Sequence, residues 1–402
     1  MERSESDAAA TGRPWRSRTV QAVLVSTALA PLGVPLISPG LSVFRDAFGV
    51  SDAQAGLLVS GYFVVGIVLS PFIGILTDRV GRKRVLVAGL LAFGVLGGAM
   101  AFAPTFEVVL ALRVLQGTGA AAIFIATVTI IGDMFDGPQR NAVLGLNVAV
   151  LSSTAAVFPV LGGVLVTIRW EAPFLAYFAA IPVALFVLVA LPEPARASGG
   201  GGVAYLREAF RAIAVPRVIG LFAATFLTEA LAFGVVFTAV PFLLDDVLSP
   251  VLVGVVLLAA EVASTVVAAA SGQFARRLTS GRIVALGFGC YGVGFVGAWA
   301  ASEPTAFAVS LVVAGAGIGL LLPAIDAAVS EQIPPGYRAG AFSLRNSTTF
   351  LGRATGPIVF TGLASTTALG YEPLLLGAGV VAGTVALLTL MATRTPTAEG
   401  SD

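Results

Sequence analysis

The sequence predicts an all-α integral membrane protein with twelve transmembrane helices in two pseudo-symmetric halves of six. Hydrophobic residues make up 57% of the 402 residues and charged ones only 11%, whereas a soluble domain carries about 25% charged residues. Twelve apolar runs, most with the roughly 20 residues that a spanning helix needs, are separated by short polar segments. Finally, the second half of the chain repeats landmarks of the first.

The expected spans follow from these apolar runs. They lie near 20–40, 54–76, 85–103, 106–131, 141–167, 173–191, 218–243, 251–274, 283–301, 305–330, 340–364 and 373–392. The first run contains Pro31 and Pro35, so we expect a retained first helix that these prolines bend or break. The patterns Ser51-x-x-Gln54 and Ser249-Pro250 are typical of helix starts and precede the second and eighth runs.

An internal repeat divides the chain. At a constant offset of 198, Arg140 matches Arg338 and Pro159 matches Pro357. The longest hydrophilic stretch, 192–217, lies between the two copies and predicts a central linker on the cytoplasmic side. We therefore expect one six-helix half in 1–191 and another in 218–402.

The basic residues predict the orientation in the membrane. If the N-terminus is inside, most of the 23 Lys and Arg residues fall in cytoplasmic segments, and only Arg45 and Arg169 fall outside. This asymmetry predicts a multi-pass protein of the cell membrane with both termini in the cytoplasm.

Composition also excludes several function classes. A net charge of +1 does not suit a nucleic-acid partner. The chain has one cysteine, Cys290, and no histidine, so neither a metal centre nor another cofactor is expected and proton chemistry falls to carboxylates. An enzyme embedded in the membrane would lack its usual catalytic groups, and a sensor would lack a soluble output domain. We therefore expect no enzymatic activity.

The segment 74–84 is the most informative motif. It reads Gly-Ile-Leu-Thr-Asp-Arg-Val-Gly-Arg-Lys-Arg and joins the second and third runs. It resembles the Gly-x-x-x-Asp-Arg-x-Gly-Arg-Lys-x signature of major facilitator superfamily transporters. The resemblance implies the fold of that superfamily and a conformational latch. The latch residues would be Gly74, Asp78, Arg79, Gly81 and Arg82. The second copy has Arg276 where the aspartate should be, so we expect a one-sided latch.

The fourth run carries Arg113 and Gln116, which resemble the Arg-x-x-Gln-Gly motif that the family links to proton coupling. An intramembrane arginine is costly and must find an acceptor, so the alternative is an ion pair that only holds the bundle together.

The fifth run matches part of a glycine-rich motif of proton-coupled drug antiporters. The matching positions are Gly145, Pro159, Gly162 and Gly163, while Thr154 and Phe158 replace two of its glycines. Close helix packing explains these residues as well as antiport does.

The seventh run combines aromatic residues with one acid. Phe222, Phe226, Glu229, Phe233 and Phe237 fall within about 80° of arc on an ideal helix. A wall of this kind suits a lipophilic or cationic substrate, and Glu229 offers a protonation site. A packing role for the phenylalanines is the alternative.

Other charged residues lie within the later runs. Glu261 in the eighth is a second candidate proton site, and Arg353 in the eleventh joins the predicted substrate and proton pathway. We expect Asp326 to reach water and Arg345 to extend to the membrane surface. The three intramembrane bases and three acids are expected to pair.

The resemblance and these residues together predict a secondary transporter that exports a small lipophilic or cationic compound in exchange for protons. The alternative is a symporter or uniporter that imports a sugar or an organic anion. The expected partners are the small-molecule substrate, protons and the lipid bilayer, and the protein is expected to be a monomer.

Overall fold

The computed structural model describes residues 17–193, 215–367 and 370–393. Regular structure in this part of the chain is entirely helical. The α-helices are α2 (Arg18–Leu29), α3 (Leu41–Phe48), α4 (Asp52–Val80), α5 (Arg82–Ala99), α6 (Phe106–Met134), α7 (Gly137–Ile168), α8 (Ala172–Leu175), α9 (Ala180–Ala190), α11 (Pro216–Leu231), α12 (Val240–Leu243), α13 (Pro250–Ala269), α14 (Ser271–Ala275), α15 (Ser280–Ala300), α16 (Pro304–Gln332), α17 (Arg338–Thr366) and α18 (Glu372–Ala392). The 3-10 segments are η2 (Ala30–Leu32), η3 (Ser38–Gly40), η4 (Met100–Phe102), η5 (Ala176–Ala179) and η7 (Pro335–Tyr337), while η6 (Ala232–Ala239) is π-helical.

In the described residues, 10 helices are long and apolar enough to cross a membrane. The two remaining expected spans are the first, which is broken, and α17, which carries Arg345 and Arg353. Together these elements form the twelve-helix fold that the sequence predicts. Most of the expected central linker lies outside the described residues.

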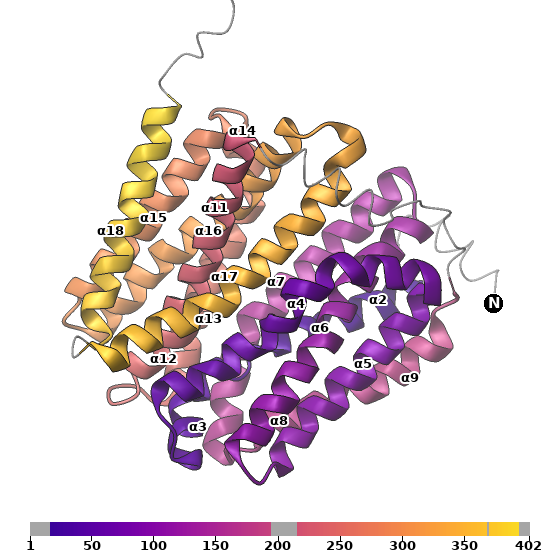
Figure 1. Ribbon diagram of the computed structural model, residues 1–402, viewed down its shortest axis with the longest axis horizontal. Helices are drawn as coiled ribbons and strands as arrows, with labels where there is room; N and C mark the ends of the chain where they lie inside the picture. The colour runs from indigo at the N-terminus through magenta and orange to yellow at the C-terminus, as the bar shows by residue number, and fades with distance from the viewer. Residues whose placement is uncertain (1–16, 194–214, 368–369, 394–402) are drawn as a thin grey trace, which may run out of the picture.

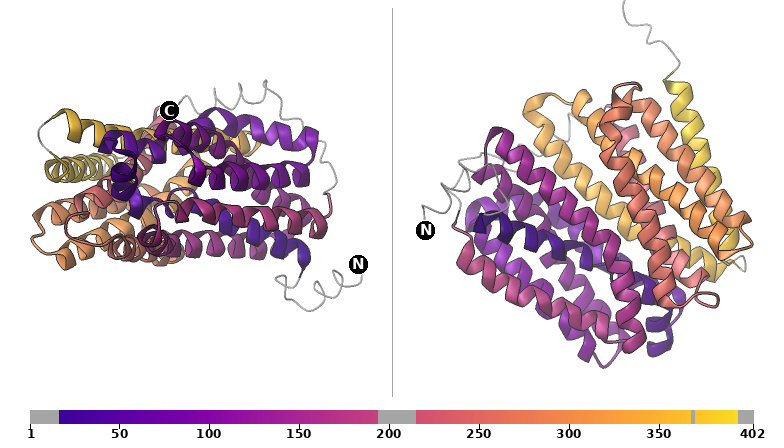
Figure 2. Two further views of the ribbon diagram at one scale, coloured as in Figure 1. Left: turned by 90° about the horizontal axis from the view of Figure 1, so that it is seen from below. Right: turned by 180° about the vertical axis from the view of Figure 1, so that it is seen from behind.

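The helices form two groups that lie side by side (Figures 1 and 2). The first helix group, α2–α9, is indigo to magenta, and the second helix group, α11–α18, is salmon to yellow. Helices α4 and α17 pack together at the boundary, as do α7 and α13.

Because successive long helices alternate in direction, the bundle has two ends. The α3 end holds 41–52, 240–250, 366–367 and 370–372, and the basic-loop end holds 80–84, 133–138 and 332–338.

Local signals at the helix starts are confirmed. Ser51 and Gln54 form a reciprocal capping box at the start of α4. The Ser249 side chain accepts from the Leu252 amide at the start of α13. Between α4 and α5, Gly81 has a φ of 110°, a conformation that favours glycine and makes the sharp turn of the basic loop possible.

The first span is broken, as its prolines predict. Helix α2 ends at Leu29, η2 contains Pro31, and a regular helix resumes only at Leu41. Proline supplies no amide donor and its ring clashes with the preceding turn, which explains the interruption. The break leaves backbone carbonyls in the membrane interior that other groups must satisfy.

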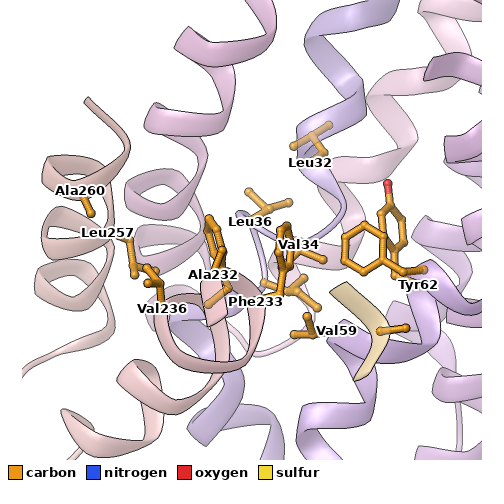
Figure 3. Close-up of a cluster of buried hydrophobic side chains, with 14 of the residues drawn as sticks. Leu32, Val34, Leu36, Val59, Tyr62, Ala232, Phe233, Val236, Leu257 and Ala260 are labelled. Atoms are coloured by element: carbon orange, nitrogen blue, oxygen red, sulfur yellow. The ribbon is translucent and has the colours of Figure 1, made fainter. Parts of the chain in front are cut away.

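The seventh span departs from the ideal helix that the sequence analysis assumed. Its middle, Ala232–Ala239, is π-helical, a form that is rare and frequent at functional sites. At the offset of 198, these residues correspond to 34–41, so both copies lose regular α-helix at the same place. Figure 3 shows Leu32 and Val34 of the first irregularity together with Phe233 of the second.

Candidate functional site

An ion pair between α11 and α17 lies at the centre of the candidate site. Arg353 Nε donates to Glu229 Oε2 at 2.8 Å, and Nη2 donates to Oε1 at 3.1 Å. The side chain of Glu229 is 5% exposed and that of Arg353 is 28% exposed. A fork of this kind fixes both side chains, so Glu229 is not a free carboxylate in this conformation.

Glycines make this pair possible. A Cβ atom added to Gly352 would meet the Phe226 carbonyl and the Glu229 side chain, and one added to Gly356 would meet the Ala230 carbonyl. Helices α11 and α17 therefore approach closely at small residues, as helices in membranes commonly do. Arg353 follows Gly352 directly and is held against Glu229.

Two aromatic rings that contact each other lie against the Arg353 guanidinium. Its central carbon lies 4.8 Å from the Phe233 ring centroid and 5.5 Å from that of Phe63. The two rings contact each other at 5.0 Å, and Phe63 also stacks on Phe350 at 6.1 Å. The result is an aromatic cage built from both helix groups, with Arg353 as its cation.

Only part of the predicted aromatic wall takes part in this cage. Phe233 and Phe237 lie on the π-helical segment and contact each other at 5.0 Å. Phe222 and Phe226 are partly buried, and neither makes a ring contact within the described residues. The π-helix changes the angle between successive residues, so the five residues no longer share one arc. Sequence reasoning missed Phe63 and Phe350, because nothing distinguishes them among 26 phenylalanines.

Glu261 of α13 is a second carboxylate near the pair. It attracts Arg353 and repels Glu229 electrostatically. Its side chain is partly exposed, and within the described residues it makes no hydrogen bond or ion pair. The structure therefore brings together Glu229, Glu261 and Arg353, three of the predicted pathway residues, and leaves Glu261 available to a proton or a ligand.

Arg113 is fully buried but, contrary to expectation, has no acidic partner in the described part of the chain. Its Nε donates to the Leu58 carbonyl at 2.8 Å, its Nη1 to Gln116 Oε1 at 2.7 Å, and its Nη2 to the Gly33 carbonyl. Tyr62 lies under the guanidinium, with its ring centroid at 4.5 Å. In this conformation Arg113 and Gln116 satisfy oxygens around the broken first helix, so the expected pairing of every base with an acid is wrong.

Asp326 and Arg345 form a further pair within the second helix group, with 3.0 Å between Asp326 Oδ1 and Arg345 Nε. The Arg345 side chain is 11% exposed and that of Asp326 is 41% exposed. Asp326 is thus partly exposed, as expected, and Arg345 is one of the intramembrane bases that pairs with an acid.

The glycines of the α7 motif have different surroundings, and one of them lies at the boundary between the helix groups. A Cβ added to Gly162 would meet the Leu36 carbonyl, and one added to Gly163 would meet the Pro250 carbonyl of α13. Pro159 is buried on the same face. Gly145 is exposed, and a Cβ there would enter open space. Close packing accounts for three of the four motif residues.

The basic loop contacts its own helix group. Arg82 pairs with Asp133 at the end of α6, and the Lys83 amide donates to Glu193 at 3.2 Å. Arg79 is exposed, while the environments of Gly74 and Asp78 lie outside what the structure describes.

Polar contacts join the two helix groups at the α3 end. Ser38 Oγ donates to the Phe237 carbonyl at 2.5 Å, and the Tyr371 hydroxyl donates to Asp52 at 3.0 Å. Arg45 Nη1 lies 3.1 Å from Asp245, whose side chain is 16% exposed. The sequence predicts an external position for Arg45 but indicates no partner for it. The pairing across 200 residues follows from the packing of the helix groups.

Burial raises the pKa of Asp245, and the nearby Asp246 and Asp52 carboxylates act in the same direction. Arg45 opposes this shift but does not cancel it. One of the contacts at the α3 end therefore depends on the Asp245 carboxyl, whose ionised form is disfavoured by burial.

The sequence matches a known protein family over most of its length. The model of the Major Facilitator Superfamily matches residues 23–282 and 222–402. The chain belongs to the Major Facilitator Superfamily. It is therefore a multi-pass membrane transporter of a family that moves small molecules across a lipid bilayer, and not a member of an enzyme family.

An exporter and a drug-resistance protein are among the relatives of this superfamily member. It is 30% identical over 355 residues to the bacillibactin exporter of Bacillus subtilis. This alignment covers 83% of this chain and 87% of that protein. It is also 28% identical over 173 residues to the quinolone resistance protein NorA of Staphylococcus aureus. This second alignment covers 42% of this chain and 44% of that protein.

Solved structures share the fold. A bacterial homologue of the human lysosomal transporter Spinster, in an inward-facing and unoccupied conformation, superposes with a TM-score of 0.75 at 19% identity. That alignment covers 96% of this chain and 100% of the other. The nucleoside transporter NupG also reaches 0.75 at 13% identity, over 93% of this chain and 100% of that one.

Proposed function

We propose that this protein exports a small lipophilic compound in exchange for protons, by alternating access of a site between its two helix groups. Its similarity to a bacillibactin exporter and to a quinolone resistance protein supports export. The observation that carries proton coupling is Glu261, a carboxylate without a partner beside the Glu229–Arg353 pair. An intramembrane acid of this kind is a candidate for proton binding.

The proposed cycle uses the charges of this cluster. From the cell interior, substrate would enter while Glu261 is ionised. After the change of conformation, protonation of Glu261 from outside would favour substrate release. Each proton that moves inward across the membrane supplies about 2.3 kcal/mol per 100 mV, which is enough to build a useful gradient.

The contacts at the α3 end support a specific conformation within this cycle. We infer that the α3 end faces outward, because the basic loop is at the other end and basic residues favour the cytoplasm. With the contacts from Ser38, Arg45 and Tyr371 formed, the outer side is closed. The proposed latch at 74–84 would act in the opposite conformation, when the basic-loop ends of the helix groups meet.

Transport by reconstituted protein tests this proposal. Liposomes containing the full chain are given an acidic interior, and the uptake of fluorescent lipophilic dyes of different charge is followed. A proton antiporter accumulates dye inside as protons leave. The Glu261→Gln variant should lose gradient-driven uptake while retaining downhill exchange. Accumulation only when the interior is alkaline would instead identify a symporter, and the proposal would be wrong.

A further inference from the structure

One edge of Arg353 is free to bind a ligand. Its Nε and Nη2 atoms are taken by Glu229, but Nη1 has no hydrogen-bond acceptor within the described residues. The side chain is 28% exposed, so this edge is reachable. A guanidinium N–H on an exposed edge binds a carboxylate or another anionic oxygen well.

The faces of the Phe63 and Phe233 rings are already occupied, because the Arg353 guanidinium lies over both of them. A substrate cation would therefore have to displace Arg353 to use these rings. An anionic group can instead approach in the guanidinium plane, toward Nη1. The aromatic body of such a molecule would then lie next to the cage formed by Phe63, Phe233 and Phe350.

Glu261 provides the opposite charge. It attracts Arg353 across the site and has no partner among the described residues. A ligand with only an acidic group would leave this carboxylate in the membrane interior without a counter-ion. A ligand that also carries an ammonium group would neutralise it.

We propose that the substrate is an aromatic zwitterion, with its anionic group on Arg353 and its cationic group on Glu261. This inference rests on the proposed function, because it names the substrate class of the same site. It also explains how a single acid can exchange substrate for a proton: the ammonium group and the proton compete for Glu261.

Binding of matched probes tests the proposal without any proton gradient. The full-length protein in lipid nanodiscs is titrated with three ligands that share one dansyl fluorophore. Nε-dansyl-lysine carries an acid and an ammonium, dansylglycine only the acid, and dansylcadaverine only the ammonium. Each added charged contact is worth about 1.5 kcal/mol, so the zwitterion should bind about tenfold more tightly than either single-charge probe.

Two variants assign the charges. Glu261→Gln should reduce the affinity for the zwitterion to that for dansylglycine. Arg353→Lys keeps a positive charge beside Glu229 but loses the free guanidinium edge, so it should reduce the affinity for the zwitterion to that for dansylcadaverine. Arg140→Gln changes an exposed base on α7 and serves as the control. Thermal unfolding of each variant shows whether it is folded.

The results separate this inference from the proposed function. No saturable binding, equal affinity for the three probes, or tighter binding of dansylcadaverine than of the zwitterion would each overturn the substrate class. An unchanged order of affinities in a folded Glu261→Gln protein would overturn the assigned contact. If the zwitterion binds as expected but no gradient-driven transport follows, proton-coupled export fails and the substrate class stands.

Discussion

Gly163 of α7 and Gly254 of α13 occupy reciprocal positions where the two helix groups cross. A Cβ on Gly163 would meet the carbonyl of Pro250, four residues before Gly254, and a Cβ on Gly254 would meet the carbonyl of Pro159, four residues before Gly163. The two backbones are therefore in direct contact. This crossing lies toward the α3 end and helps to close it.

Replacing Gly163 with alanine should open the α3 end. The added methyl group has no space, and overpacking costs about 1–3 kcal/mol. Spin labels at the exposed residues Phe102 and Val247, in a variant without Cys290, report the separation of the helix groups. We expect a longer mean distance in Gly163→Ala. Gly145→Ala, on the same helix but facing open space, should leave the distance unchanged. The same mean distance in Gly163→Ala and Gly145→Ala would show that Gly163 does not help to close the α3 end.

Breaking the Glu229–Arg353 pair should destabilise the protein. Glu229→Gln leaves a largely buried guanidinium without its counter-ion, which costs about 3 kcal/mol. Thermal unfolding in nanodiscs measures the loss, and the double variant with Arg353→Gln should recover most of it. Glu171→Gln is a matched control, because it leaves unpaired the Arg169 side chain, which is 73% exposed, and such a pair is worth about 1 kcal/mol or less. A double variant less stable than Glu229→Gln would rule out an uncompensated charge as the cause.

Arg113 should hold the broken first helix in place. Arg113→Lys keeps the charge but cannot reach the Leu58 and Gly33 carbonyls and Gln116 at once. Losing one charged hydrogen bond costs about 1.5 kcal/mol, so amides near 30–37 should exchange with deuterium about tenfold faster. Hydrogen exchange with mass spectrometry measures this, with Arg140→Lys as the control. If exchange becomes faster only outside 30–37, Arg113 does not hold the broken first helix in place.

The α3 end should close more firmly as the pH falls. Because the pKa of Asp245 is raised where it is buried, the closed form binds a proton more tightly than an open form with solvated Asp245. Proton binding by Asp245 therefore favours the closed form fully at a pH below the ordinary pKa of an aspartate. This effect is lost as the pH rises through the raised pKa of Asp245. The spin-label distance described above should therefore lengthen over that range.

Asp245→Asn should remove this dependence on pH, since the amide does not titrate. The charged neighbours Arg45, Asp246 and Asp52 remain in the variant, so a dependence that persists would have to be assigned to them. The expected result is a distance that stays constant across the same range in Asp245→Asn.

Much of the candidate site could be named from the sequence, but its contacts could not. Glu229, Glu261 and Arg353 stand out because charges are rare in apolar runs, and the structure brings these three together. The same reasoning failed for Arg113, whose partners are backbone carbonyls and amide or hydroxyl groups. Such acceptors exist at every residue, so no sequence pattern marks them.

By itself, the sequence determined the membrane-spanning class, the broken first helix, the caps of α4 and α13, and the family, because composition, proline and local hydrogen bonds act over short distances along the chain. Only the tertiary structure decided that η6 is π-helical, that Arg353 lies over the rings of Phe63 and Phe233, and that Arg45 reaches Asp245. These contacts depend on how closely two helices approach. That approach is set by small residues on both helices at once, and a pattern within one helix does not contain it.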